Sequence, residues 1–108
     1  TSFSETNPLT FISRFCSKLS MTKELIKLCE FIAIQVDKNN YIPENTPHSI
    51  AAGIVYFVSF ITNTNITKKN IHDITEISEV TINKCYKKMY IIRDKIVPPV
   101  ILKKYGHV

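Results

Sequence analysis

Apolar residues recur every three or four positions in five segments of the chain, which is the spacing of amphipathic helices. The pattern predicts helices over residues 8–19, 22–39, 47–62, 67–75 and 78–94. Four of these segments begin beside a side chain that can accept hydrogen bonds from free backbone N–H groups: Asn7, Thr22, Thr46 and Thr67. Proline follows the cap at residues 8 and 47, where it suits the first helical position.

The central segment contains the apolar run "IAAGIVYFVSFI", residues 50–61. A helix that is apolar on all sides is expected to be surrounded by other helices, and Gly53 would let a neighbour approach closely. Twelve helical residues rise about 18 Å, too short for a bilayer, so we expect no membrane partner. Three aromatic residues of this helix are expected inside the bundle: Tyr56, Phe57 and Phe60.

The last predicted helix has two different sides when its residues are placed at about 100° intervals. Ile82, Cys85, Tyr86, Met89 and Ile96 form a core stripe on one side, and Arg93, which falls on the same line, marks where the stripe ends. The opposite side carries Val80, Asn83, Lys84 and Lys87. It therefore begins with a small apolar group and an amide and then becomes cationic, which is unusual for a plain surface helix.

Length and composition favour one all-α domain. The chain has 108 residues, 44% of them hydrophobic, with only two glycines for the turns that an all-β domain needs. We assign residues 1–108 to a single domain with 97–108 as a C-terminal tail, because Pro98 and Pro99 should stop the last helix. Three separated cysteines have no metal-ligand spacing, so we expect free, buried thiols and no metal or other cofactor.

Positive charge is concentrated near the C-terminal end. The net charge is +5, and positions 81–108 hold seven lysine or arginine residues against one carboxylate. Such a concentration favours a polyanionic partner, with nucleic acid first. The alternative is a solvated lysine-rich end that binds nothing specific.

The last two predicted helices have the order of a helix-turn-helix. A short helix is followed by the connection "EIS" (76–78), in which Ile77 would fill the joint, and then by the long basic helix. A valine can contact a thymine methyl, an asparagine can pair with adenine, and lysines can bind guanine or phosphate. The short helix begins "TKKN", where free N–H groups and two lysines coincide and can hold a phosphate.

Three blocks of the chain resemble a known family when they are taken together. "FISRFCSKL", "TPHSIAAGIVYFVSF" and "ITKKNIHDITEISEVTINKCYKKMY" resemble the second cyclin-like repeat of general transcription initiation factor IIB and its archaeal counterpart, over roughly residues 8–92. The resemblance implies a five-helix cyclin-like fold wrapped around the third helix, with a helix-turn-helix formed by the last two helices.

The resemblance also implies a nuclear protein with defined partners. It would bind double-stranded promoter DNA beside the TATA box together with TATA-box-binding protein, and would support assembly of the RNA polymerase II preinitiation complex. The implied base-contacting residues are Val80, Thr81 and Asn83. The residues expected to contact phosphates are Thr67, Lys68, Lys69, Lys84, Lys87 and Lys88.

Two positions depart from the family pattern. Family members usually carry arginine where this chain has Asn83, and glycine where it has Glu76. Since asparagine prefers adenine, any preference for upstream sequence should be weaker or shifted toward A·T pairs. The whole factor would also carry a zinc ribbon and a first repeat, so we expect this chain to be a piece of a longer protein that binds DNA weakly alone.

Two other classes of function stay open at this point. A cyclin-like domain can serve as a protein–protein adaptor without direct DNA contact, in which case the basic end would meet an acidic protein surface. An enzyme is disfavoured, because His48, His72 and His107 have no nucleophile at a convincing spacing. We therefore expect locally bonded or solvated histidines and no small-molecule substrate.

Overall fold

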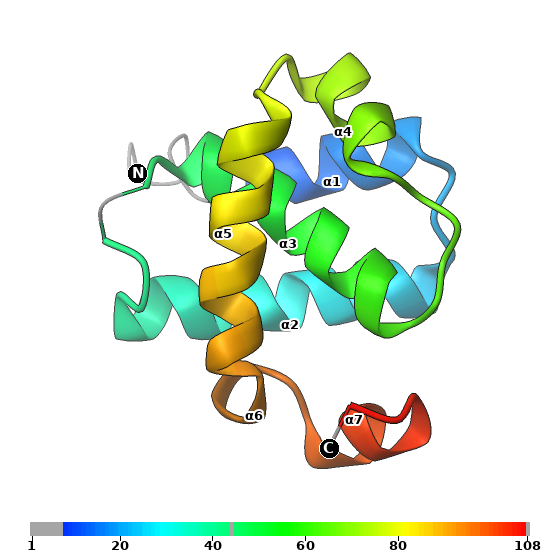
Figure 1. Cartoon of the computed structure of the whole chain (residues 1–108), viewed down its shortest axis with the longest axis vertical. Helices are drawn as coiled ribbons and strands as arrows, with labels where there is room; N and C mark the ends of the chain where they lie inside the picture. Colours follow the sequence, from blue (N-terminus) through cyan, green and yellow to red (C-terminus); the bar gives the residue numbers. More distant parts are fainter. Residues whose placement is uncertain (1–7, 44, 108) are drawn as a thin grey trace.

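A computed structural model describes residues 8–43 and 45–107, and over these residues it contains seven α-helices and no strand (Figure 1). The helices are α1 (Pro8–Lys18), α2 (Lys23–Asn39), α3 (Pro47–Ile61), α4 (Lys68–Thr75), α5 (Glu79–Ile91), α6 (Arg93–Ile96) and α7 (Pro99–Lys104). The all-helical class predicted from composition is confirmed for this part of the chain.

The first five helices match the five predicted segments, because their caps were readable from the sequence. The side chains of Thr22, Thr46 and Thr67 each accept a hydrogen bond from the backbone N–H three residues later, at 3.2–3.3 Å. Ser78 does the same for α5. The remaining predicted cap, Asn7, lies outside the described residues.

The expected count of five helices is wrong. The fifth helix ends at Ile91 rather than near residue 94, and α6 follows after the non-helical Ile92 (φ −105°, ψ 22°). The segment predicted as a tail contains α7, because Pro99 stands at a first helical position, where a missing N–H is harmless. Val97 and Leu102 are buried, so this segment packs against the other helices.

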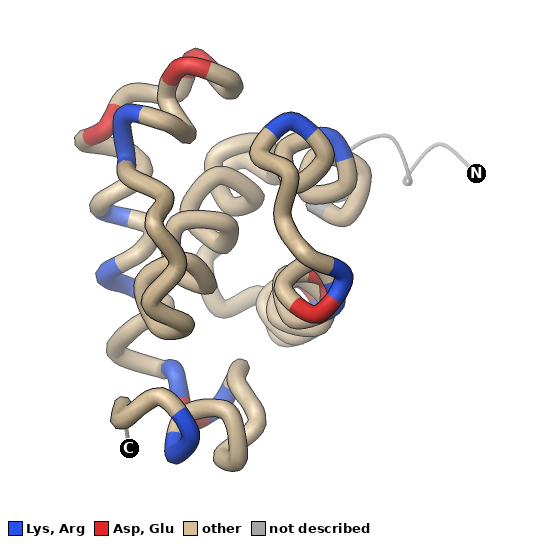
Figure 2. The backbone as a smooth tube through the Cα atoms, turned by 90° about the vertical axis from the view of Figure 1, so that its right-hand side faces the viewer, with Lys and Arg blue, Asp and Glu red and all other residues tan. Residues whose placement is uncertain are grey.

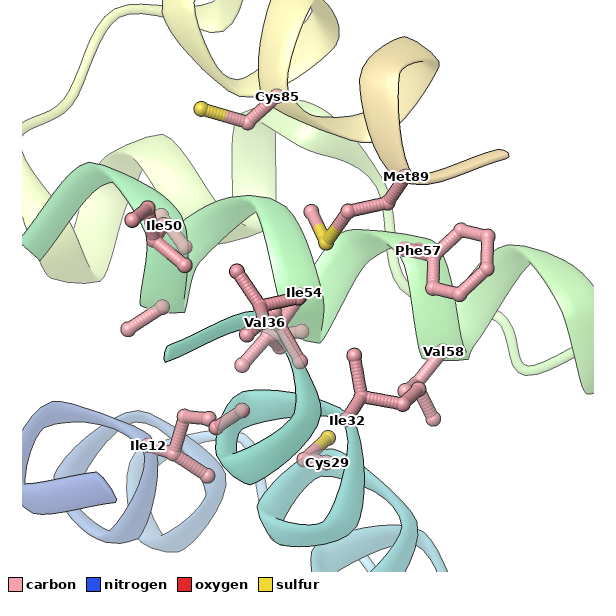
Figure 3. Close-up of a cluster of buried hydrophobic side chains, with 14 of the residues drawn as sticks. Ile12, Cys29, Ile32, Val36, Ile50, Ile54, Phe57, Val58, Cys85 and Met89 are labelled. Atoms are coloured by element: carbon pink, nitrogen blue, oxygen red, sulfur yellow. The ribbon is translucent and has the colours of Figure 1, made fainter. Parts of the chain in front are cut away.

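Helix α3 is the centre of the arrangement. It contacts α1, α2, α4 and α5, and α5 crosses it in front (Figure 1). Figure 3 shows its side chains meeting Ile12 of α1 and Ile32 of α2 on one side, and Met89 of α5 on the other. The expectation that the apolar helix would be surrounded is thus confirmed.

Close approach of α3 and α5 depends on Gly53. A Cβ atom built on Gly53 would collide with the Cβ atom of Cys85 and lie 3.0 Å from Cε of Met89. The buried residues of α5 are Ile82, Cys85 and Met89, three members of the predicted stripe. Tyr86 is half-buried, and Arg93 and Ile96 lie beyond α5, in α6. Packing against Gly53 therefore fixes which side of α5 faces the core and which side faces outward.

All three cysteines are free and buried, as expected. Cys29 lies beside Cys16 in the contact between α1 and α2. The hydrogen bond between the two thiols and their burial hold the pKa of Cys29 well above its usual range. Buried neutral thiols of this kind act as small apolar residues. Separately, none of the described helices combines the length and apolar character needed to cross a membrane.

Candidate nucleic-acid interface

The connection between α4 and α5 begins with a left-handed residue. Glu76 has φ 62° and ψ 14°, and its backbone N–H donates to the carbonyl oxygen of His72 at 2.7 Å. This is the C-terminal cap geometry in which glycine is favoured, because a Cβ atom makes the left-handed conformation costly. The turn therefore keeps a backbone suited to glycine, although the sequence supplies glutamate.

Local hydrogen bonds hold the rest of the turn. The Thr75 hydroxyl donates to the carbonyl oxygen of Ile71 at 2.8 Å and accepts from the N–H of Ile77 at 3.1 Å. The carbonyl oxygen of Ile77 lies 2.8 Å from Nδ1 of His72. The Ile77 side chain is only 9% exposed, so it fills the joint as predicted. Together these contacts fix the angle between α4 and α5.

The start of α4 is closed by a reciprocal cap. Thr67 accepts from the N–H of Asn70, and the N–H of Thr67 donates to Oδ1 of Asn70 at 3.0 Å. The first turn of α4 then carries Lys68, which is half-buried, and Lys69, which is exposed. Two lysines thus lie at a helix start whose backbone orientation is fixed.

The first turns of α5 present the predicted outward face. Val80 is 64% exposed, Lys84 and Lys87 are exposed, and Asn83 is half-buried. These four residues, together with Lys68 of α4 and Glu79 of α5, line an open hollow of about 380 Å³. In Figure 2 lysine and arginine positions follow the left edge of the molecule, where α5 runs, and acidic positions gather near its upper end.

A side-chain contact joins the two helices at this hollow. Nζ of Lys68 donates to Oδ1 of Asn83 at 3.2 Å. The same ammonium lies 5.7 Å from the centroid of the Tyr56 ring, within the range of a cation–π interaction. No sequence pattern predicts this contact, since Lys68 and Asn83 are fifteen positions apart and on different helices. Glu79 was likewise not anticipated as part of the lining.

Two of the predicted contact residues lie at the flank of this face. Thr81 is half-buried, and its hydroxyl oxygen accepts from the Ser78 hydroxyl at 3.0 Å. Lys88 is half-buried, and its ammonium donates to Oδ1 of Asn45, in the loop before α3, at 3.1 Å. The hollow therefore brings together Val80, Asn83, Lys84, Lys87 and Lys68, while Thr81 and Lys88 point elsewhere.

An aromatic cluster supports α5 from behind. The Tyr86 ring packs edge-on against those of Tyr56 and Phe60, with centroids 5.1 Å apart in both cases. Burial, with smaller contributions from Tyr56 and Tyr90, raises the pKa of Tyr86 above its usual value. The expectation of a fully internal cluster is right only for Phe57, because Tyr56 is half-buried and Phe60 is 40% exposed.

The histidines have structural partners. His48 packs against the rings of Phe11 and Phe15, with centroids 4.9 and 5.5 Å away, and His72 bonds within the turn described above. Nδ1 of His107 lies 3.4 Å from the hydroxyl oxygen of Tyr90. Among the residues that the structure describes, no three His, Cys, Asp or Glu side chains converge to form a metal site.

Comparisons with known proteins identify the family. Residues 1–92 match the family described as "Transcription factor TFIIB repeat". The chain is 34% identical over 88 residues to transcription initiation factor IIB of Dictyostelium discoideum, covering 82% of this chain and 27% of that protein. It is 35% identical over 80 residues to the Xenopus laevis factor and 34% identical over 80 residues to the human factor, covering 74% of this chain and 25% of each relative.

The family match extends over α1 to α5 and so includes both helices of the candidate interface. The chain spans only about a quarter of the length of the relatives it matches. The three blocks that resemble the family in sequence, the helices α1 to α5 and the matched residues 1–92 fall in the same part of the chain. The chain belongs to the transcription factor TFIIB repeat family.

Proposed function

We propose that this chain is a DNA-binding module of a general transcription initiation factor. In this proposal α4 and α5 act as a helix-turn-helix, and the first turns of α5 enter the major groove of promoter DNA beside the TATA box. The module acts together with TATA-box-binding protein in the nucleus and supports assembly of the RNA polymerase II preinitiation complex. Family membership supports the role in transcription initiation, while the DNA contact is argued from the geometry of the hollow.

The observation that carries the proposal is the exposure of the start of α5. Val80 is 64% exposed and lines one open hollow together with lysines of two helices, so this part of α5 is accessible to a partner. It suits a surface on which an apolar group contacts a base edge while lysines neutralise phosphates. The rigid turn and the Gly53 contact keep this surface oriented outward.

The proposed contacts follow from position on this surface. Val80 and Asn83 reach base edges, and Thr81, at the flank, contacts a base only at the margin of the groove. Phosphates on either side of the groove are bound by Thr67 and Lys69 at the start of α4, and by Lys84, Lys87 and Lys88 along α5. Lys68 is held against Asn83 and lines the hollow beside it.

A mobility-shift assay with TATA-containing duplex DNA tests this function. The full chain is added with and without TATA-box-binding protein, and binding is compared between the unaltered chain, Val80→Asp and Ile91→Asp. Both replaced side chains are exposed residues of α5, with Ile91 76% exposed, so the two variants place the same charge at opposite ends of one helix. We expect Val80→Asp to lose the shifted complex and Ile91→Asp to keep it.

The adaptor alternative gives a different result in the same assay. An adaptor would join the complex of DNA and TATA-box-binding protein through protein contacts, and Val80→Asp would then bind as well as the unaltered chain. Equal binding by the two aspartate variants would therefore contradict a DNA contact by α5.

A further inference from the structure

Lys68 and Asn83 form one unit at the floor of the hollow. An ammonium group only donates hydrogen bonds, so the atom of the Asn83 amide that faces it at 3.2 Å must be the acceptor oxygen. This fixes the orientation of the amide, and its NH₂ group is directed away from Lys68. The position of the ammonium is in turn restrained by the Tyr56 ring and by the half-buried state of Lys68.

The unit offers many donors and little acceptor capacity. The Asn83 amide has two N–H donors, and the Lys68 ammonium has two left after its bond to Oδ1. The acceptor oxygen of Asn83 is already engaged and lies beside a positive charge. This is the donor pattern of an arginine side chain, assembled from two residues of different helices.

We propose that Lys68 and Asn83 together read guanine, with Lys68 acting as the residue that determines specificity. This inference rests on the proposed function and deepens it. In the major groove guanine presents two acceptors, O6 and N7, which match the donors of the unit. Adenine presents the acceptor N7 and the donor N6, and this donor would face the Lys68 ammonium. The preference therefore differs from the A·T preference expected for an asparagine considered alone.

Removal of the Lys68 ammonium should reverse the preference. Without it, Oδ1 of Asn83 can accept from N6 of adenine while its N–H donates to N7, which is the bidentate adenine contact of an asparagine. Lys68→Met removes the charge but keeps an unbranched apolar side chain against Tyr56, so the fold should be retained. Lys69→Met is the matched control, because Lys69 is the neighbouring lysine of the same helix turn and is exposed.

The experiment selects bound duplexes from a random pool and then measures affinities for the selected site with guanine or adenine at the responsive position. Four proteins are compared, each as the full chain: unaltered, Lys68→Met, Lys69→Met and Asn83→Ala. The unaltered chain and Lys69→Met should favour guanine, Lys68→Met should favour adenine by about fivefold or more, and Asn83→Ala should lose the preference. Both methionine variants should lose overall affinity, since each removes one cation.

The outcomes separate the inference from the function on which it rests. Binding with the same base preference in the unaltered chain and Lys68→Met would overturn the role of Lys68 and leave DNA binding intact. A preference of the unaltered chain for adenine would also overturn it. If none of the four proteins binds any duplex, either alone or with TATA-box-binding protein on TATA-containing DNA, the proposed function itself is wrong, and the inference fails with it.

Discussion

At the scale of single residues, Glu76 shows a conflict between sequence and backbone. It adopts φ 62° at the end of α4, where the left-handed conformation costs an L-residue roughly 1–2 kcal/mol. Its side chain is exposed, and the hydrogen bond that ends α4 comes from its backbone. The turn is held in spite of this residue by the contacts of Thr75, Ile77 and His72.

Replacing Glu76 with glycine should therefore stabilise the protein. We expect Glu76→Gly to raise the free energy of unfolding by about 0.5–1 kcal/mol, since relief of the left-handed strain exceeds the greater backbone entropy of glycine in the unfolded chain. Urea unfolding followed by circular dichroism measures this. Glu76→Ala removes the same carboxylate but keeps Cβ, so a gain of equal size in both variants would show that charge, not backbone conformation, is responsible.

Glu79 is a second such residue, because it should stabilise α5 and weaken the binding of DNA. It lies in the first turn of α5, where a carboxylate interacts favourably with the helix dipole, but it also lines the cationic hollow. We expect Glu79→Gln to strengthen binding to duplex DNA by about two- to fivefold, because one repulsion with phosphate is removed. The free energy of unfolding should fall by about 0.3–1 kcal/mol. Fluorescence anisotropy with labelled DNA checks the first effect, and weaker binding by the variant would exclude a phosphate near Glu79.

Residues of the candidate site differ in how far the sequence could predict them. The exposure of Val80, Lys84 and Lys87 follows from helical periodicity once the buried stripe of α5 is known. The bond between Lys68 and Asn83 does not, because it depends on the crossing of α4 and α5 and on the rotamer of a long side chain. Thr81 and Lys88 were expected on the binding face and lie at its flank, since each lies about 80–100° around the helix from Val80.

At the scale of helices, the contact of α3 with α5 sets the orientation of the site. No side chain separates the two backbones at Gly53, where an added Cβ would meet Cys85 and Met89. Movement of α5 away from α3 would also change the position of the outward face relative to α4. The smallest residue of the core helix thus controls the geometry of a surface on another helix.

The variant Gly53→Ala tests this control. We expect it to lower the free energy of unfolding by about 1–3 kcal/mol, because overpacking outweighs the higher helix propensity of alanine. Adding Cys85→Gly removes the colliding Cβ atom, so the double variant should be more stable than the sum of the two single effects predicts. Thermal unfolding of the four proteins gives the coupling. Additive effects would mean that the two positions are not in contact.

The helices themselves were predictable to different degrees. The segments α1 to α5 have strong periodicity and clear caps, so their presence and most of their boundaries followed from local chemistry. Helices α6 and α7 have four and six residues, too few for a periodic pattern. Pro98 and Pro99, the residue before α7 and its first residue, indicated only a break. The packing of α6 and α7 depends on the contacts of Ile96, Val97 and Leu102 with the rest of the fold, which local sequence does not encode.

At the scale of the whole molecule, charge distribution and fold act together. A net charge of +5 alone would favour many polyanions without selecting among them. The fold places lysines of α4 and α5 in one hollow with an exposed valine and a restrained amide, which converts general attraction into a surface with a defined shape. The proposed function therefore depends on phosphate binding by Lys84 and Lys87 beside a groove entered by α5.

The salt dependence of DNA binding tests this claim most directly. The logarithm of the association constant is measured against the logarithm of salt concentration for the full chain and for Lys84→Ala, Lys87→Ala and Lys27→Ala, the last being an exposed lysine of α2. Each of the first two variants should reduce the magnitude of the slope by about one unit, while Lys27→Ala should leave it unchanged. Slopes that are the same for all four proteins would contradict the account.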